Sequence, residues 1–340
     1  MQLYNRVTNH SVLGGDARDT VKEKANNDDS PTSNELTNSS SPQGAVFAGM
    51  SAAQRYELDT FGFLHLHGVL SPTELASARA AFDRTQHDSS LLTPYGELPF
   101  AADADLEALA SHPKILPVLL ELCNEAPHLV SGGTLWTAPF THAGDLSQHQ
   151  QQTRGKPQGS GQLHCQREYD RHHASFASEA PGRCRCDNLV VFPYLDTCEA
   201  GDGGLLLVPG SHKSQFCRPR TIFQPYGRHE DQWQDKDWGR SSALSQEHSP
   251  AWHEVPAGLL NLCPSAGDYI ILPEASSHGI MPWRSAEHGR RVLSLRFKSG
   301  PSYAMHCATH PPHPPRLLAR LARPTRALVE SDRCHPFDTG

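Results

Sequence analysis

From Leu129 onward the sequence consists of short apolar runs that are separated by Gly, Pro and Asp residues. The runs are LVSGGTLWTAPF, QLHCQ, DNLVVFPYL, GLLLVPG, DYIILP and RRVLSLRF. Several short strands with turn residues between them favour an antiparallel sandwich or barrel over alternating βαβ units. This part of the chain is therefore predicted to be mainly β.

The region before Leu129 is predicted to supply helices that flank the β-rich part. The expected elements are a helix at 51–62, a strand at 61–70, a helix at 71–86 and a helix at about 111–126. The helix at 71–86 has the clearest start signal, because Ser71 can cap it and Pro72 suits its first turn. Glu74, three residues after Ser71, completes the pattern of a capping box.

Polar composition marks the expected domain organisation. Residues 1–46 are rich in Asn, Ser, Asp and Thr, and such a segment cannot bury enough apolar surface to offset its ordering entropy. We expect a disordered tail there, a folded domain at 47–305, and a C-terminal tail at 306–340 that docks on the domain. Polar inserts at 141–161 and 218–250 interrupt the domain, and loops of that length are usually functional lids or disordered insertions.

Charge and composition exclude several function classes. The net charge of -7 argues against a nucleic-acid partner, because phosphate neutralisation needs clustered Lys and Arg. No apolar run approaches the ~20 residues needed to span a bilayer, and the first residues, MQLYNRVTNH, lack the pattern of a secretory signal. The nine cysteines are an odd number, which favours reduced thiols over a disulfide framework. We therefore expect a cytoplasmic protein.

Three residues of the β-rich part suggest metal chemistry. His164 and His278 are 114 residues apart, so only tertiary structure can bring them together. A jelly roll does so readily, because strands of its two sheets converge at one open end. Two imidazoles suit Fe(II), and a facial set of two His and one carboxylate leaves positions for O2 and an oxidisable ligand. Arg290, on the next strand, would point into the same barrel and could pair with a dicarboxylate.

Four stretches of the sequence resemble the phytanoyl-CoA dioxygenase-like family of Fe(II)/2-oxoglutarate-dependent oxygenases. They are GFLHLHGVLSPTELASARAAFD, LVVFPYLDTCEAGDGGLLLVPGSHK, SAGDYIILPEASSHGIMPWR and GRRVLSLRF. The resemblance implies a double-stranded β-helix (jelly roll, cupin-like) fold with flanking helices. It also implies that His164 and His278 bind iron and that Arg290 anchors 2-oxoglutarate, with Arg291 as the alternative anchor.

The third iron ligand departs from the family pattern. The family usually has His-x-Asp at the first histidine, whereas this chain has His164, Cys165 and Gln166. A neutral amide is a weaker iron ligand than a carboxylate. Gln166 or a water could complete the site, or Glu168 or Asp170 could reach the metal. Alternatively a halide could take the position, as in related halogenases, or the chain could have kept the fold and lost the chemistry.

The leading hypothesis is an Fe(II)/2-oxoglutarate-dependent dioxygenase that hydroxylates a small or medium-sized organic substrate. Its expected cofactor is Fe(II), with 2-oxoglutarate and O2 as co-substrates. The second hypothesis is a catalytically weakened or inactive jelly-roll protein that binds an organic acid or a partner without turnover. Gln166 is the feature that separates the two hypotheses.

Overall fold

The computed structural model describes residues 49–87, 98–139, 163–165, 176–179, 182–216, 255, 257–281, 283–310 and 312–330. All of them belong to one compact unit, Phe47–Gly340. The predicted tail at 1–46 and the inserts at 141–161 and 218–250 lie outside the described residues. The domain boundaries at residues 46 and 305 therefore stay predictions.

Strands and helices alternate irregularly along the described chain. The strands are β1 (Leu64–Leu66), β2 (His128–Thr137), β3 (Phe176–Glu179), β4 (Arg183–Cys186), β5 (Asn188–Pro193), β6 (Leu205–Leu207), β7 (Leu260–Leu262), β8 (Tyr269–Pro273), β9 (His278–Ile280) and β10 (Arg290–Lys298). The helices are α2 (Ala52–Phe61), α3 (Pro72–His87), η2 (Pro99–Ala102), α4 (Ala104–Ala110), α5 (Leu116–Leu122), η3 (Ser211–Lys213), α9 (Gly300–Thr309), α10 (Pro315–Leu318) and α11 (Arg323–Val329).

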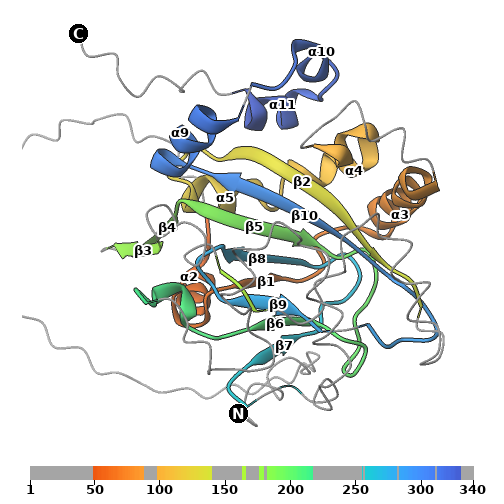
Figure 1. Ribbon diagram of the computed structural model, residues 1–340, viewed down its shortest axis with the longest axis horizontal. Coiled ribbons are helices and arrows are strands. Elements are labelled where there is room, and N and C mark those ends of the chain that lie inside the picture. The colour runs from red at the N-terminus through yellow and green to blue at the C-terminus, as the bar shows by residue number, and fades with distance from the viewer. Residues whose placement is uncertain are drawn as a thin grey trace, which may run out of the picture. The chain divides into compact units, whose positions relative to one another are not determined.

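The strands form two main antiparallel sheets. The larger sheet has five strands in the order β1-β8-β5-β10-β2, and the smaller has three in the order β7-β6-β9 (Figure 1). A separate hairpin pairs β3 with β4. The chain crosses repeatedly between the two main sheets, since β5, β8 and β10 belong to one and β6, β7 and β9 to the other. This arrangement confirms the predicted mainly β jelly-roll fold with flanking helices.

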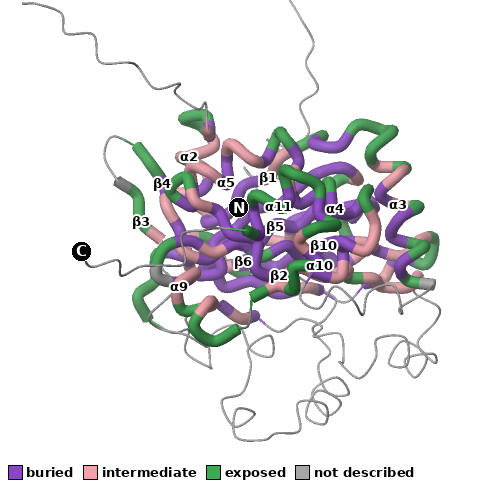
Figure 2. The backbone as a smooth tube through the Cα atoms, turned by 90° about the horizontal axis from the view of Figure 1, so that it is seen from above, coloured by how far each residue is buried: buried purple, intermediate pink, exposed green. Residues whose placement is uncertain are grey.

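Alternate residues of the large sheet are buried in two different layers, as the period-2 geometry of a strand requires. Leu189 and Val191 of β5 belong to the core that also contains Phe82 of α3 and Leu328 of α11. Phe192, on the opposite face of β5, is buried outside that core. Figure 2 shows the buried central strands with more exposed helical segments around them. The helices therefore cover one face of the large sheet and leave the other for the barrel interior.

The predicted helices form largely where the capping signals place them. Ser71 and Glu74 make the reciprocal hydrogen bonds of a capping box at the start of α3, with N–O distances of 2.8 and 3.3 Å. Ser51 caps α2 in the same way. The strand expected at 61–70 is only three residues long, because Gly62 ends α2 in the left-handed conformation and a turn follows at Gly68. Within the described residues, no helix is both long enough and apolar enough to cross a membrane.

Gly62 offers a test of the packing between α2 and the barrel. Its φ is 81°, and a Cβ there would lie 2.4 Å from Nδ1 of His212, which is buried in η3. We expect Gly62→Ala to lower the free energy of unfolding by roughly 2–4 kcal/mol, because the left-handed backbone and the overpacking both disfavour a side chain. Thermal or urea denaturation measures this. The matched control is Gly182→Ala, at φ 92° with nothing within 4 Å, which should lose only the backbone part; equal losses would exclude the His212 contact as a cause.

Candidate active site

His164 and His278 are neighbours in the structure. They form an antiparallel bridge in which each backbone amide donates to the other residue's carbonyl oxygen at 2.9 Å. His278 begins β9 and pairs on its other side with Leu207 of β6. Directly opposed residues of antiparallel strands share one face, and the two imidazole ring centroids are 4.4 Å apart. Two imidazoles distant in sequence therefore meet at the edge of the small sheet.

The surroundings of His278 suit a neutral metal ligand. The residue is 3% exposed, and its Nδ1 lies 2.8 Å from the carbonyl oxygen of Ser276. A carbonyl only accepts, so Nδ1 carries the proton and Nε2 keeps its lone pair. Burial lowers the pKa of His278, against a smaller opposing effect of the Glu274 carboxylate. The imidazole is therefore neutral at physiological pH, which is the state that binds metals.

Arg290 places a buried positive charge at the start of β10. The residue is 8% exposed, and its guanidinium makes two long hydrogen bonds of 3.4 Å, to the Gly203 carbonyl and the Thr137 hydroxyl. Its guanidinium carbon lies 5.2 Å from the centroid of the Trp283 ring. Burial lowers the pKa of Arg290, yet a guanidinium stays charged in proteins. Among the described residues no carboxylate pairs with it, so an acidic ligand would suit this cation.

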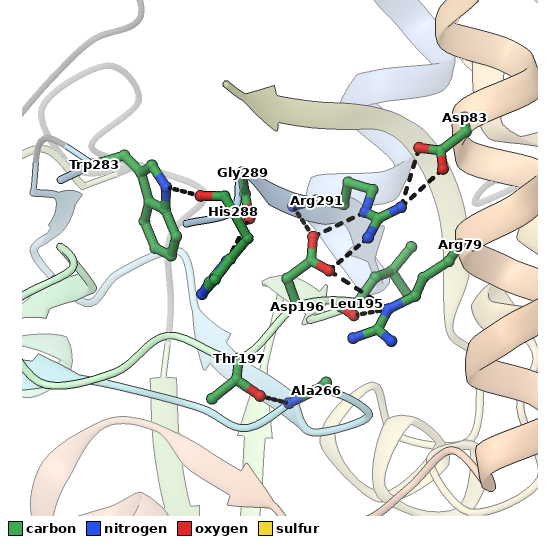
Figure 3. Close-up of polar contacts among 10 residues, drawn as sticks. All are labelled: Arg79, Asp83, Leu195, Asp196, Thr197, Ala266, Trp283, His288, Gly289 and Arg291. Carbon is green, nitrogen blue, oxygen red and sulfur yellow. Dashed lines mark hydrogen bonds and ion pairs between the residues drawn. The ribbon is translucent and has the colours of Figure 1, made fainter. Parts of the chain in front are cut away.

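The neighbouring Arg291 has different contacts, as strand alternation requires. Its Nε and Nη2 donate to Asp196 at 2.8 and 2.7 Å, and its Nη1 donates to Asp83 of α3 at 2.9 Å (Figure 3). Arg79 of α3 approaches the same Asp196 carboxylate at 3.4 Å. These ion pairs fasten β10 to the helical layer. Because its guanidinium already contacts two carboxylates, the geometry favours Arg290 over Arg291 as a 2-oxoglutarate anchor.

The remaining predicted ligands, Gln166, Glu168 and Asp170, lie outside the described residues. Cys165 is the last described residue before them, and it is buried. The alternatives for the third position therefore stay open. The described part of the site fits the expected group nonetheless: two adjacent imidazoles suit a borderline metal such as iron, and a buried guanidinium suits a dicarboxylate.

A comparison with protein families identifies the chain. The family model described as Phytanoyl-CoA dioxygenase (PhyH) matches residues 58–291, which is more than half of the sequence. The chain belongs to the phytanoyl-CoA dioxygenase family. Membership confirms the resemblance inferred from the sequence.

The chain is also similar to several solved structures. HygX from Streptomyces hygroscopicus, with nickel and 2-oxoglutarate bound, is 18% identical at a TM-score of 0.49, over 74% of this chain and 88% of HygX. The non-haem α-ketoglutarate-dependent carbocyclase SnoK from nogalamycin biosynthesis is 19% identical at a TM-score of 0.44, over 74% of this chain and 85% of SnoK. A comparison with curated proteins found no match. The family assignment rests on the family model.

Trp283 is a site residue that the sequence analysis did not single out. It is 6% exposed, its ring lies beside the Arg290 guanidinium, and its Nε1 donates to the His288 carbonyl at 2.8 Å (Figure 3). The indole is thus held in place by its own hydrogen bond. In the sequence Trp283 lies seven residues before Arg290, and this separation alone does not reveal a contact.

We expect Trp283→Leu to raise the KM for 2-oxoglutarate by about 2–30-fold, the equivalent of a cation–π contact of ~0.5–2 kcal/mol. The kcat should change less, because the indole would position Arg290 rather than touch the reacting atoms. Steady-state kinetics at varied 2-oxoglutarate separates the two constants. Trp136→Leu, on β2 and packed against the helical core, is the control and should leave KM unchanged. A fall in kcat alone would contradict the positioning role.

Proposed function

We propose that this family member hydroxylates a small or medium-sized organic substrate, with His164 and His278 as iron ligands and Arg290 as the 2-oxoglutarate anchor. The supporting observation is the pairing of two imidazoles at 4.4 Å in a barrel that also holds a buried arginine without a carboxylate partner among the described residues. A buried guanidinium without a carboxylate partner among the described residues is unfavourable unless a ligand supplies the negative charge.

In this proposal the chain's own residues bind the iron and orient 2-oxoglutarate. His164 and His278 provide two nitrogen ligands, and the carbonyl of Ser276 fixes the tautomer of His278. Gln166, a water, or the carboxylate of Glu168 or Asp170 provides a third. The guanidinium of Arg290 donates two hydrogen bonds to the distal carboxylate of 2-oxoglutarate in a bidentate contact. When bound, iron with 2-oxoglutarate and O2 supplies the oxidising chemistry, while the protein supplies geometry and charge.

The proposal extends to partners and location. O2 is the second co-substrate, and the net charge of -7 supports the absence of a nucleic-acid partner. No disulfide forms among the cysteines of the described residues, which supports a reducing, cytoplasmic location.

Anaerobic addition of Fe(II) and 2-oxoglutarate to the full chain tests the proposal. A working site gives a weak visible metal-to-ligand charge-transfer band, and aerobic reaction then gives succinate. A folded protein that shows neither would instead support the second candidate, a jelly-roll protein that binds without turnover.

Gln166→Asp tests the third ligand position. We expect Fe(II) to bind about tenfold more tightly, because a carboxylate is a better iron ligand than an amide and adds a compensating charge. Competition with a fluorescent chelator under anaerobic conditions measures the Kd. Gln162→Asp, earlier in the same run, is the matched control and should leave the Kd unchanged. Unchanged or weaker binding in Gln166→Asp would direct attention to Glu168 and Asp170.

A further inference from the structure

A second group of metal-binding side chains lies where β1 and β8 begin to separate. The two strands pair antiparallel through His65↔Ile270 and Leu66↔Tyr269, and this register continues to place His67 opposite Asp268. Residues two apart on a strand share one face, so His65 and His67 lie on the same side of the sheet. Opposed residues also share a face. The register therefore brings two imidazoles to one carboxylate.

Interatomic distances confirm this convergence. The Nε2 of His65 lies 2.8 Å from Oδ2 of Asp268, and the Nδ1 of His67 lies 3.3 Å from the same oxygen. The two imidazole centroids are 3.8 Å apart. Within the described residues, this is the one group of three His, Cys, Asp or Glu side chains whose ligand atoms all lie within 4.8 Å of one another.

In the part of the chain that the structure describes, no lysine or arginine pairs with Asp268. Its side chain is 5% exposed, and its ion-pair partners among the described residues are the two histidines alone. Burial tends to raise the pKa of Asp268, but hydrogen bonds from His65 and the amides of Gly68 and Ser265 lower it overall. The nearby ammonium of Lys114 donates to the carbonyls of Gly68 and Val69 instead. The buried carboxylate of Asp268 is therefore held by two imidazoles and by the backbone amides of Gly68 and Ser265.

We propose that His65, His67 and Asp268 bind a divalent transition-metal ion of the zinc class. Imidazole with carboxylate is a donor set for zinc, nickel, copper or iron, whereas magnesium and calcium favour all-oxygen sites. Ligand atoms of a tetrahedral zinc site are about 3.3 Å apart, given bonds of ~2.0–2.1 Å. The separation of 3.3 Å at His67 already matches, and the 2.8 Å at His65 needs a small opening. The His67 side chain is 66% exposed, which gives solvent access for the ion and a water ligand.

The ion would join residues about 200 positions apart and fasten β1, which is an edge strand. The site is distinct from the active site, because Asp268 precedes β8 and His278 follows it. The five residues of β8 span roughly 16 Å at ~3.3 Å each. The proposal therefore does not depend on the proposed function.

Zinc stoichiometry tests the proposal on the full chain after removal of metals by a chelator. The proteins are wild type, His67→Asn, His278→Ala and the double variant, each dialysed against Zn²⁺ and analysed for metal per folded chain. We expect His67→Asn to lose one equivalent relative to wild type, and the double variant to lose one more than His278→Ala. Zinc should raise the Tm of wild type by a few degrees, as expected for a domain of this size. This rise should be smaller in His67→Asn, because the contribution of the proposed site is lost.

The control His310→Asn changes another exposed histidine and should keep the wild-type stoichiometry. When Mg²⁺ replaces Zn²⁺ as the probe, the Tm of these proteins should not rise. Equal zinc binding by wild type and His67→Asn would overturn the proposal. Because His67 is largely exposed, its substitution should leave the metal-free fold intact, which the Tm without zinc checks. A loss in His67→Asn with none in His278→Ala would support this site and count against the proposed iron ligands.

Discussion

His278→Ala is expected to weaken Fe(II) binding by more than about 100-fold and to remove 2-oxoglutarate turnover. Loss of a residue that merely orients a metal ligand lowers affinity ~10–100-fold, so loss of the ligand itself should exceed that range. Anaerobic Fe(II) titration, followed through the charge-transfer band, measures the change.

The same titration on His164→Ala and on the double variant makes the test sharper. If both imidazoles bind one ion, the double variant should lose little more than either single one, because groups that act as a unit are not additive. His310→Ala changes an exposed histidine and should retain the band. Two histidines on separate metals would give independent, additive losses, and that result would contradict the site. His164 is less buried than His278, so His164→Ala should disturb folding less and still report on metal binding if His278→Ala fails to fold.

Arg290→Gln is expected to weaken 2-oxoglutarate binding by about 30-fold or more. Removing one partner of a buried charge pair costs ~2–5 kcal/mol, because the other charge loses its counter-ion. Arg290→Lys should recover only part of the affinity, since an ammonium cannot make the bidentate contact. Isothermal titration of the Fe(II) protein without O2 measures each Kd.

A matched ligand and a matched variant separate anchoring from folding. 2-Oxobutyrate lacks the distal carboxylate, so wild type should prefer 2-oxoglutarate strongly and Arg290→Gln should lose most of that preference. Arg291→Gln should keep the preference but lower the free energy of unfolding by about 1–3 kcal/mol, because the buried Asp196 loses two of its donors. A preserved preference in Arg290→Gln would place the anchor elsewhere.

The sequence predicted the strands that form continuous apolar runs between turn residues, including β6 with three residues and β8 with five. β5 and β10 read as apolar runs between Gly, Pro and Asp, and both form as expected. β7 and β9 were missed because their residues, LNL and HGI, do not form a continuous apolar run as the LLL of β6 does. α3 was predicted from its capping box, which is a local signal. Signals that lie within one turn or one strand are therefore the ones that can be recognised from a single sequence.

Site residues were predictable to a different extent. The meeting of His164 and His278 followed from the order of motifs in the family, because no local pattern joins residues 114 positions apart. The choice between Arg290 and Arg291 required the register of β10, which tertiary pairing sets. His65 and His67 form a visible alternating pair, but their partner Asp268 lies about 200 residues away. Distance in the sequence thus hid the contacts that carry the chemistry.

The two consecutive arginines also have a consequence for the alignment of β10 against its neighbours. Arg290 faces the barrel, whereas Arg291 is fastened by Asp196 and Asp83 on the helical side. If β10 slid by one residue, the two side chains would exchange faces, as in any strand. Arg291 would then leave Asp196 and Asp83 for the barrel interior, and Arg290 would leave the pocket. The two arginines therefore disfavour a one-residue shift in the register of β10. The strand that supplies the pocket residue also fixes its own alignment.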